Sequence, residues 1–321
     1  VDYDGTASSL LVEPQRTNLI TTSEDFDAYR IAGSTVTPNS TTAPDGTNSG
    51  ILVTQGVSTL VLRASNVVAP STTYTFSGYF KSSSSVTQVT LDITDYGNTT
   101  FDLTSEWQRF SITAESRPGG SPYHFVDVAT NGIQGDTFYA WGLQLEEATY
   151  GTSYIPTSGS TVTRVQDQYS KTGISNLINS EEGVLFLEMA ALSDDGTYRL
   201  ISLEDNSDSS TFAYLGYKDT SNTIRVRIEI SGSLSASMEF VSSNETEFNK
   251  IAFKWKTNDF ALWVNGVEVA TDSSGVSFTA NTLDKLSFDR NGGLKFNGKV
   301  KQLQVFKTAL TDSELATLTT I

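Results

Sequence analysis

The strongest constraint on the fold of this chain lies near its C-terminal end. Residues 260–264 follow the alternating pattern of a strand, and Asn265-Gly266 supplies the two left-handed positions of a tight primed turn. The alternation resumes at Val267 and Val269. We therefore predict two antiparallel strands joined by a two-residue turn.

A short helix is predicted directly before the C-terminus. Thr311 stands at the N-cap position, and Glu314 can reach back to its amide, as in a capping box. Leu310 and Leu315 occupy the positions of a hydrophobic staple, which fixes the entry of the chain into a helix. Such a helix would cover one end of a β-sandwich.

Short strands fill the rest of the chain. Tyr74, Phe76 and Phe80 share one parity, as the buried side chains of a strand do, and residues 139–145 repeat the alternation. The predicted fold class is all-β, with two β-sandwich domains and a short C-terminal helix. Strand signals recur at short spacing in the second half, at residues 184–189, 198–203, 212–217, 224–230 and 251–255.

Length and composition predict two domains. A chain of 321 residues exceeds the usual size of one sandwich and suffices for two cores. Residues 1–16 are interpreted as an extended N-terminal arm, 17–157 as the first sandwich, 158–164 as a linker and 165–321 as the second sandwich. We expect each sandwich to fold on its own.

Charge and composition exclude several classes of function. A formal net charge of −16 disfavours nucleic-acid binding, which needs clustered Lys and Arg. The absence of cysteine excludes disulfides and thiolate metal sites, and no apolar run is long enough to span a bilayer. The chain starts at Val1 with neither an initiator Met nor a signal-peptide pattern, so we expect an excised piece or part of a longer polypeptide, without membrane insertion.

No constellation of catalytic residues is recognisable, so we expect a protein that is not an enzyme. His124 is the only histidine, and a general base there would need partners that the sequence does not supply. With 37 acidic residues, chance pairs of carboxylates are certain, and a glycosidase pair cannot be assigned. Arg225 and Arg227 are interpreted as part of a solvated strand face.

Several segments of the second half carry a family resemblance. They are the run Asn249–Trp255, the turn Trp263–Gly266, the ending from Gly298 to Phe306 and the capped segment from Ala309 to Leu315. This set resembles the laminin-G-like branch of the concanavalin A-like sandwiches. The resemblance implies a concanavalin-like sandwich over roughly the second half of the chain.

A second resemblance begins at the front of the chain. It rests on the segments Leu10–Ile20, Ser23–Phe26, Ala43–Thr47, Tyr74–Lys81, Glu106–Ser111 and Phe138–Glu146. They are similar to a module that recurs in fibre, spike and other virion surface proteins of tailed bacteriophages. That module resembles the jelly-roll carbohydrate-binding modules of polysaccharide-degrading enzymes, so the first sandwich is expected to be a jelly roll.

Together the resemblances imply a virion surface protein of the tail-fibre, tail-tip or head-spike type that binds a host cell-surface glycan for adsorption. Its expected partners are bacterial surface polysaccharide and other virion proteins. We expect a homo-oligomer, for which a trimer is the usual form among fibres, assembled in the host cytoplasm and carried on the virion surface. Two alternatives stay open: a purely structural or decoration protein of the capsid or tail, and a polysaccharide-degrading enzyme or its accessory module.

The first sandwich contains candidate carbohydrate-binding residues. Tyr79 and Lys81 have the parity opposite to the core residues of their strand, and Trp107 and Arg109 have the parity opposite to those of theirs. If the two strands are neighbours, all four side chains share an exposed face. Tyr79 is the preferred stacking residue, whereas Trp107 has the alternative of a core or edge aromatic. Further candidates on flanking loops are Tyr96, Tyr123 and His124.

Calcium is the metal that the sequence allows as a structural ion, and no other cofactor is expected. Asp194, Asp195, Asp205 and Asp208 could offer hard oxygen ligands at the rim of the second sandwich, although polar loops of this kind are more often solvated. In the jelly-roll modules, the resemblance implies an Asp near the final strand that helps to hold calcium. This chain has Ala140-Trp141 there.

Overall fold

The computed structural model describes residues 9–31, 33–65, 67–83, 85–119 and 125–321. These residues form two compact units. The first unit contains residues 15–166, and the second combines residues 9–14 with residues 167–321. Strands dominate both units, which confirms the predicted all-β fold class with a short C-terminal helix.

The expected N-terminal arm needs a correction, because part of it belongs to the second unit. Leu10–Val12 forms strand β1, which pairs antiparallel with β23 (Gly298–Phe306). Val12 is fully buried in the core of the second unit. The chain then enters the first unit at Gln15 and returns to the second at Asp167. The first unit is thus inserted between β1 and the rest of the second.

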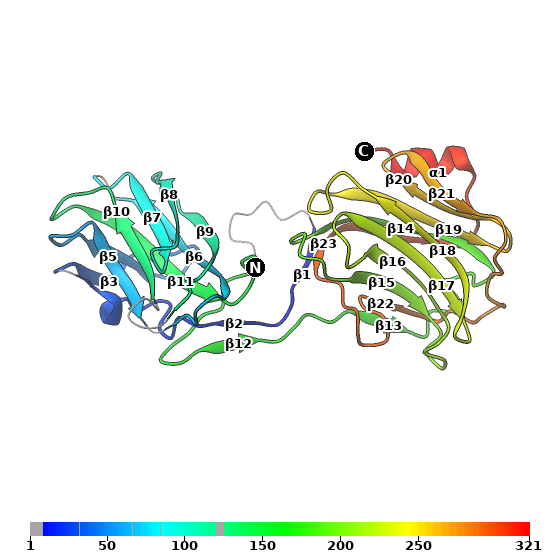
Figure 1. Cartoon of the computed structure of the whole chain (residues 1–321), viewed down its shortest axis with the longest axis horizontal. Coiled ribbons are helices and arrows are strands. Elements are labelled where there is room, and N and C mark those ends of the chain that lie inside the picture. Colours follow the sequence, from blue (N-terminus) through cyan, green and yellow to red (C-terminus); the bar gives the residue numbers. More distant parts are fainter. Residues whose placement is uncertain (1–8, 32, 66, 84, 120–124) are drawn as a thin grey trace. The chain divides into compact units, whose positions relative to one another are not determined.

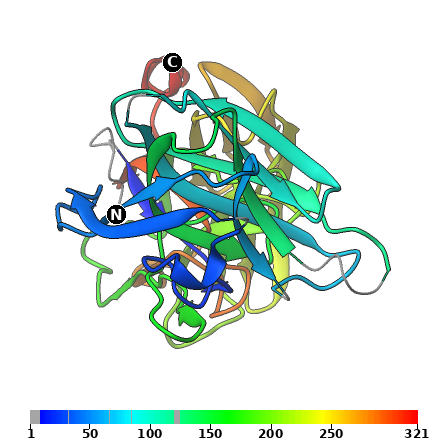
Figure 2. The ribbon, with the colours of Figure 1, turned by 90° about the vertical axis from the view of Figure 1, so that its left-hand side faces the viewer.

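The first unit is a sandwich of two antiparallel sheets (Figures 1 and 2). Sheet 1 has the strand order β3 (Thr35–Thr41), β4 (Gly50–Thr54), β11 (Thr137–Glu146), β6 (Thr73–Ser82) and β9 (Gln108–Glu115). Sheet 2 has the order β5 (Leu60–Ser65), β10 (Phe125–Thr130), β7 (Gln88–Ile93) and β8 (Gly97–Asp102). β2 (Arg16–Asn18) and β12 (Val162–Arg164) pair with each other in a separate two-stranded ladder. η1 (Asp27–Tyr29) is a single helical turn.

The core of the first unit confirms the parity predicted for β6. Tyr74, Phe76 and Phe80 are buried in one apolar cluster between the sheets. Because successive side chains of a strand point to opposite faces, the intervening residues of β6 lie on the outer face of sheet 1. The predicted linker over residues 158–164 contains β12, so it is paired with β2 along part of its length.

A bulge in β11 changes which of its side chains are buried. The register with β6 shifts after Trp141, and Gly142 has a φ of 62°, which glycine adopts without a steric penalty. Before the bulge Ala140 faces the core, and after it Leu143 does. Tyr139 and Trp141 therefore lie on the outer face of sheet 1, and the uninterrupted alternation expected over residues 139–145 is wrong.

The second unit is also a sandwich of two antiparallel sheets (Figure 1). Sheet 3 has the order β1, β23, β14 (Glu182–Ala191), β19 (Asn249–Lys256), β20 (Phe260–Val264) and β21 (Val267–Asp272). Sheet 4 has the order β13 (Ser170–Thr172), β22 (Lys285–Ser287), β15 (Arg199–Glu204), β16 (Phe212–Tyr217), β17 (Thr223–Ile230) and β18 (Ser233–Val241).

The C-terminal prediction is confirmed. Asn265 and Gly266 have φ of 50° and 84° in the turn between β20 and β21. Helix α1 (Asp312–Thr319) begins with a complete capping box, in which the amide of Thr311 donates to Glu314 Oε2 at 2.8 Å. Leu315 is fully buried in an apolar cluster on sheet 3, and Figure 1 shows α1 beside β20 and β21. Among the described residues no helix is long and apolar enough to cross a membrane.

Removing the buried leucine of α1 should loosen the helix. We expect Leu315→Ala to lower the free energy of unfolding of the second unit by about 2–4 kcal/mol, because it deletes a fully buried aliphatic side chain. Thr317→Ala, at an exposed position of the same helix, is the matched control. Urea denaturation measures both variants, and equal midpoints would show that α1 is not docked.

The inserted arrangement of the chain makes a second prediction. Val12→Ala should destabilise the second unit by about 1–3 kcal/mol although residue 12 lies far in sequence from the rest of that unit. Leu10→Ala is the control, because Leu10 is 41% exposed on the same short strand. Hydrogen exchange should show faster opening of β23 in the first variant, and unchanged exchange in both would contradict the role of β1.

Candidate functional site

The outer face of sheet 1, which points away from sheet 2, carries four of the seven candidate side chains, Tyr79, Lys81, Trp107 and Arg109. β6 and β9 are neighbours, with Tyr79 opposite Arg109 in their register. On the other side of β6 runs β11, where Tyr139 is opposite Lys81. The condition for a shared face, that β6 and β9 are adjacent, is therefore met.

The ammonium group of Lys81 lies between two aromatic rings. Its Nζ is 5.0 Å from the ring centroid of Trp107 and 5.0 Å from that of Tyr139. It also donates a hydrogen bond to Thr41 Oγ1 at 3.1 Å. A cation at such distances from an aromatic face is attracted by the ring. We call Lys81, Trp107, Tyr139 and Thr41 the Lys81 cluster.

The Lys81 cluster is held in place but not enclosed. The indole N–H of Trp107 donates to the carbonyl oxygen of Thr42 at 2.8 Å, which fixes the ring against the end of β3. Lys81, Trp107 and Tyr139 are all half-buried, so each keeps part of its surface in contact with solvent. The cluster thus offers aromatic carbon, an ammonium group and a hydroxyl on one accessible face.

Tyr79, the preferred stacking residue, is buried, and this prediction needs a correction. Its side chain is only 8% exposed and packs edge-on against Trp141, with 5.3 Å between ring centroids. Ala43, in the segment that follows β3, belongs to the same cluster. The parity of Tyr79 was predicted correctly, but this segment and Trp141 cover the ring. It therefore cannot stack on a ligand.

The other predicted residues are placed as follows. Arg109 lies on the same face and donates from Nη2 to Ser77 Oγ at 3.0 Å. Tyr96 is 61% exposed, but it lies in the turn between β7 and β8 of sheet 2 and so is not part of the face. Tyr123 and His124 lie outside the described residues.

Tyr139 was not among the predicted site residues. Strict alternation from Tyr139 to Leu145 places it in the core, whereas the bulge at Gly142 turns it to the outer face beside Lys81. A glycine in the middle of a strand is a signal for such a bulge. Gly142 is therefore the residue from which the position of Tyr139 could have been inferred.

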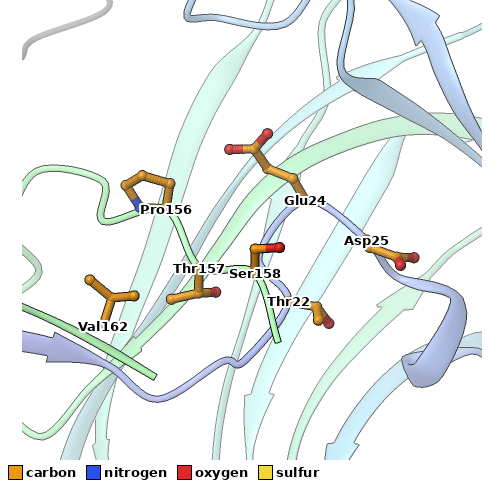
Figure 3. A pocket seen from close by; sticks show the side chains of 7 residues that line it. All are labelled: Thr22, Glu24, Asp25, Pro156, Thr157, Ser158 and Val162. Carbon is orange, nitrogen blue, oxygen red and sulfur yellow. The ribbon is translucent and has the colours of Figure 1, made fainter. Parts of the chain in front are cut away.

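An open pocket of about 550 Å³ lies elsewhere on the first unit, where the segment after β2 meets the segment before β12. Figure 3 shows Glu24 and Asp25 on one segment and Pro156 on the other. Glu24 accepts a hydrogen bond from the hydroxyl of Tyr154 at 2.8 Å. The Glu24 carboxylate therefore helps to join the two segments. The lining residues are Thr22, Glu24, Asp25, Pro156, Thr157, Ser158 and Val162.

The candidate calcium ligands of the second unit are engaged in local hydrogen bonds. Asp205 accepts from the amide of Ser207 at 2.8 Å, and hydrogen bonds from Ser210 and Thr211 lower the pKa of Asp208. Asp194 accepts from the hydroxyl of Ser221. Within the part of the chain that the structure describes, no three acidic or histidine side chains are grouped so that they could hold a metal ion.

Asp195 is instead part of a buried charged cluster. Arg199 and Glu245 are each 1% exposed, and Nη2 of Arg199 is 2.7 Å from Asp195 Oδ1. The distance from Nη1 of Arg199 to Glu245 Oε1 is longer, 3.7 Å. Burial, followed by repulsion from Asp194, raises the pKa of Glu245 to about 7, against the opposing effect of Arg199.

Residues 185–316 match the family model described as the Concanavalin A-like lectin/glucanases superfamily. All of these residues lie in the second unit, and the match confirms the predicted concanavalin-like sandwich there. The match covers less than half of the chain. No curated protein matches the sequence.

Several solved structures are similar to part of this chain. One is a leech intramolecular trans-sialidase, 20% identical, covering 44% of this chain and 24% of that chain at a TM-score of 0.38. Another is the CBM40 module of the Ruminococcus gnavus IT-sialidase bound to α2,3 sialyllactose, 17% identical, covering 47% and 98% at 0.37. A SAP-like pentraxin from Limulus polyphemus is 14% identical, covering 45% and 72% at 0.35.

The buried Glu245 predicts a pH dependence of stability. Its folded pKa of about 7 lies above the ordinary 4.5, so folding favours the protonated acid and stability falls as pH rises from 4.5 to 7. The slope should not exceed about 1.4 kcal/mol per pH unit. Glu245→Gln should flatten it, whereas the exposed Glu247→Gln should not. Chemical denaturation between pH 4.5 and 8 measures both, and parallel curves would contradict the prediction.

Proposed function

We propose that this chain is a carbohydrate-binding protein that contacts its glycan through the Lys81 cluster on the outer face of sheet 1. The observation that carries the proposal is the placement of the Lys81 ammonium between the half-buried rings of Trp107 and Tyr139. Aromatic rings offer flat apolar surface to the C–H groups of a sugar ring. The ammonium and the hydroxyl of Thr41 can hydrogen-bond to sugar hydroxyls.

Arg109 extends the proposed site along β9. Its guanidinium lies 5.6 Å from the ring centroid of the buried Tyr79, so that ring supports a cation instead of stacking on a sugar. Arg109 is half-buried, so part of its side chain stays accessible next to the Lys81 cluster.

The glycan that we propose is a bacterial surface polysaccharide, bound during adsorption of a tailed phage. The support is the resemblance of residues 10–146 to phage virion surface modules and the lectin-superfamily match of residues 185–316. We propose that the chain has no catalytic activity of its own and needs no cofactor. Homo-oligomeric display beside other virion proteins would raise the avidity of a weak site by about 10²–10⁴.

A glycan array tests the proposed site. Tetramerised protein should bind a subset of bacterial capsular and lipopolysaccharide glycans, and Trp107→Ala or Lys81→Gln should weaken that binding about tenfold or more. Tyr96→Ala is the matched control, because it removes an exposed aromatic ring from the same unit but away from this face. Thermal unfolding of each variant shows whether the fold is intact.

Two outcomes would favour the alternatives. If the wild-type tetramer binds no glycan, the chain is better explained as a structural or decoration protein. If incubation shortens a bound polysaccharide, the chain is an enzyme or part of one. The virion location is tested separately, because antibodies against the chain should label the surface of phage particles from the same source.

A further inference from the structure

Two aromatic side chains, Phe212 and Tyr214, lie buried on the outer face of sheet 4 in the second unit, and we call them the aromatic floor. Phe212 and Tyr214 alternate with the core residues of β16 and therefore point away from sheet 3. They are nevertheless only 2% and 4% exposed, and their rings lie nearly parallel with 5.8 Å between centroids. Leu200 of β15 completes this buried layer, so other side chains of the same face must cover it.

One arginine lies over this floor, and two more lie on the neighbouring strand. The guanidinium carbon of Arg290, from the loop after β22, is 3.9 Å from the ring centroid of Phe212. In the register of β16 and β17, Arg227 is opposite Tyr214 and Arg225 is opposite Gly216. The strands β15 to β18 lie side by side in Figure 1, so these groups occupy one continuous surface.

Cations outnumber carboxylates in the ion pairs of this surface. Among the described residues, these ion pairs join five cations to three carboxylates. Glu239 contacts both Lys218 and Arg225, at 3.3 Å each. Glu229 contacts Arg227 and, at 3.8 Å, Arg290, while Glu204 contacts Lys285 at 2.7 Å. These ion pairs therefore contain two more cations than carboxylates, on a protein whose formal net charge is −16.

The arginines on this face are held by ion pairs and still keep part of their surface in contact with solvent. Each guanidinium has five N–H donors in a planar fork. Arg225 pairs through its Nε with Glu239, and Arg227 pairs through its Nη2 with Glu229. The two arginines remain 18% and 28% exposed, so their outer edges reach solvent. A planar anion can bind to such a fork through two parallel hydrogen bonds.

We propose that this face, defined by Arg225, Arg227 and Arg290 over Phe212 and Tyr214, is a second binding site that takes the carboxylate of an acidic polysaccharide. The guanidinium forks match a carboxylate in shape and charge, as their own partners Glu229 and Glu239 illustrate. The ring of Phe212 holds Arg290, and ion pairs hold Arg225 and Arg227, which lowers the entropy that binding would cost.

The overall charge of the protein selects against denser polyanions. A net charge of −16 repels a nucleic acid, which carries a phosphate on every nucleotide, and two excess cations do not offset that repulsion. A polysaccharide with isolated carboxylates is repelled less and can still fill the arginine forks. This inference does not depend on the Lys81 cluster, because the two sites lie in different units and use different residues.

Binding to three carboxylated polysaccharides, hyaluronan, alginate and polygalacturonate, tests the proposal with the full chain. At least one should bind, and binding should weaken as salt is raised. Methyl esterification of that polysaccharide should abolish binding, because it removes the charge and keeps the backbone. The double variant R225Q/R227Q should lose about tenfold or more in affinity.

The matched control is K256Q/K301Q, which changes the net charge equally but acts on sheet 3 of the same unit. It should bind like the wild type. Trp107→Ala should also bind like the wild type, and if that variant lost binding, the polysaccharide would be bound at the Lys81 cluster instead. The proposal fails if none of the three polysaccharides binds, if the esterified form binds equally, or if both double variants weaken binding alike. Tighter binding of single-stranded DNA would also overturn it. Thermal unfolding confirms that R225Q/R227Q is folded.

Discussion

The constraint on which the rest of this structure depends is the burial of one parity of side chains between two sheets. Once Phe76 and Phe80 are committed to the core of the first unit, Lys81 must point outward on the same strand. The same rule commits Leu215 to the core of the second unit and Tyr214 to its outer face. Each sandwich therefore has outer faces whose composition is free to serve binding, and both candidate sites lie on such faces.

The sequence predicts well what local interactions decide. The capping box of α1 and the turn at Asn265-Gly266 involve neighbours in the chain, and both are present as expected. Parity also placed Trp107 and Arg109 correctly on the face of Lys81. Tyr79 shows where local reasoning ends, because its burial depends on a segment more than thirty residues away that carries Ala43. The periodicity of β6 cannot predict that a distant loop covers one of its outward-facing side chains.

Two further differences between the sequence-based predictions and the structure also come from contacts between distant segments. The arm residue Val12 was separated from the second sandwich by the whole first unit, so no spacing rule connects it with its partner strand β23. Arg225 and Arg227 look like an ordinary solvated strand face in sequence. Their setting comes from Arg290, which a distant loop brings onto Phe212, and from Glu239 on the next strand. Such a surface depends on three segments, and only the folded chain brings them together.

The acidic composition of the protein limits the distance over which these cationic groups can attract a ligand. At physiological ionic strength the field of a charge decays over about 8 Å, so a ligand near Lys81 or Arg227 responds mainly to the groups it touches. Farther away, the net charge of −16 disfavours any polyanion that relies on charge density alone. At the two proposed sites, selection would then come from the geometry of contact: rings beside an ammonium in one unit, and arginines that include Arg290, packed on Phe212, in the other. Repulsion at a distance together with specific contacts nearby would make the proposed binding depend on a close fit of the ligand.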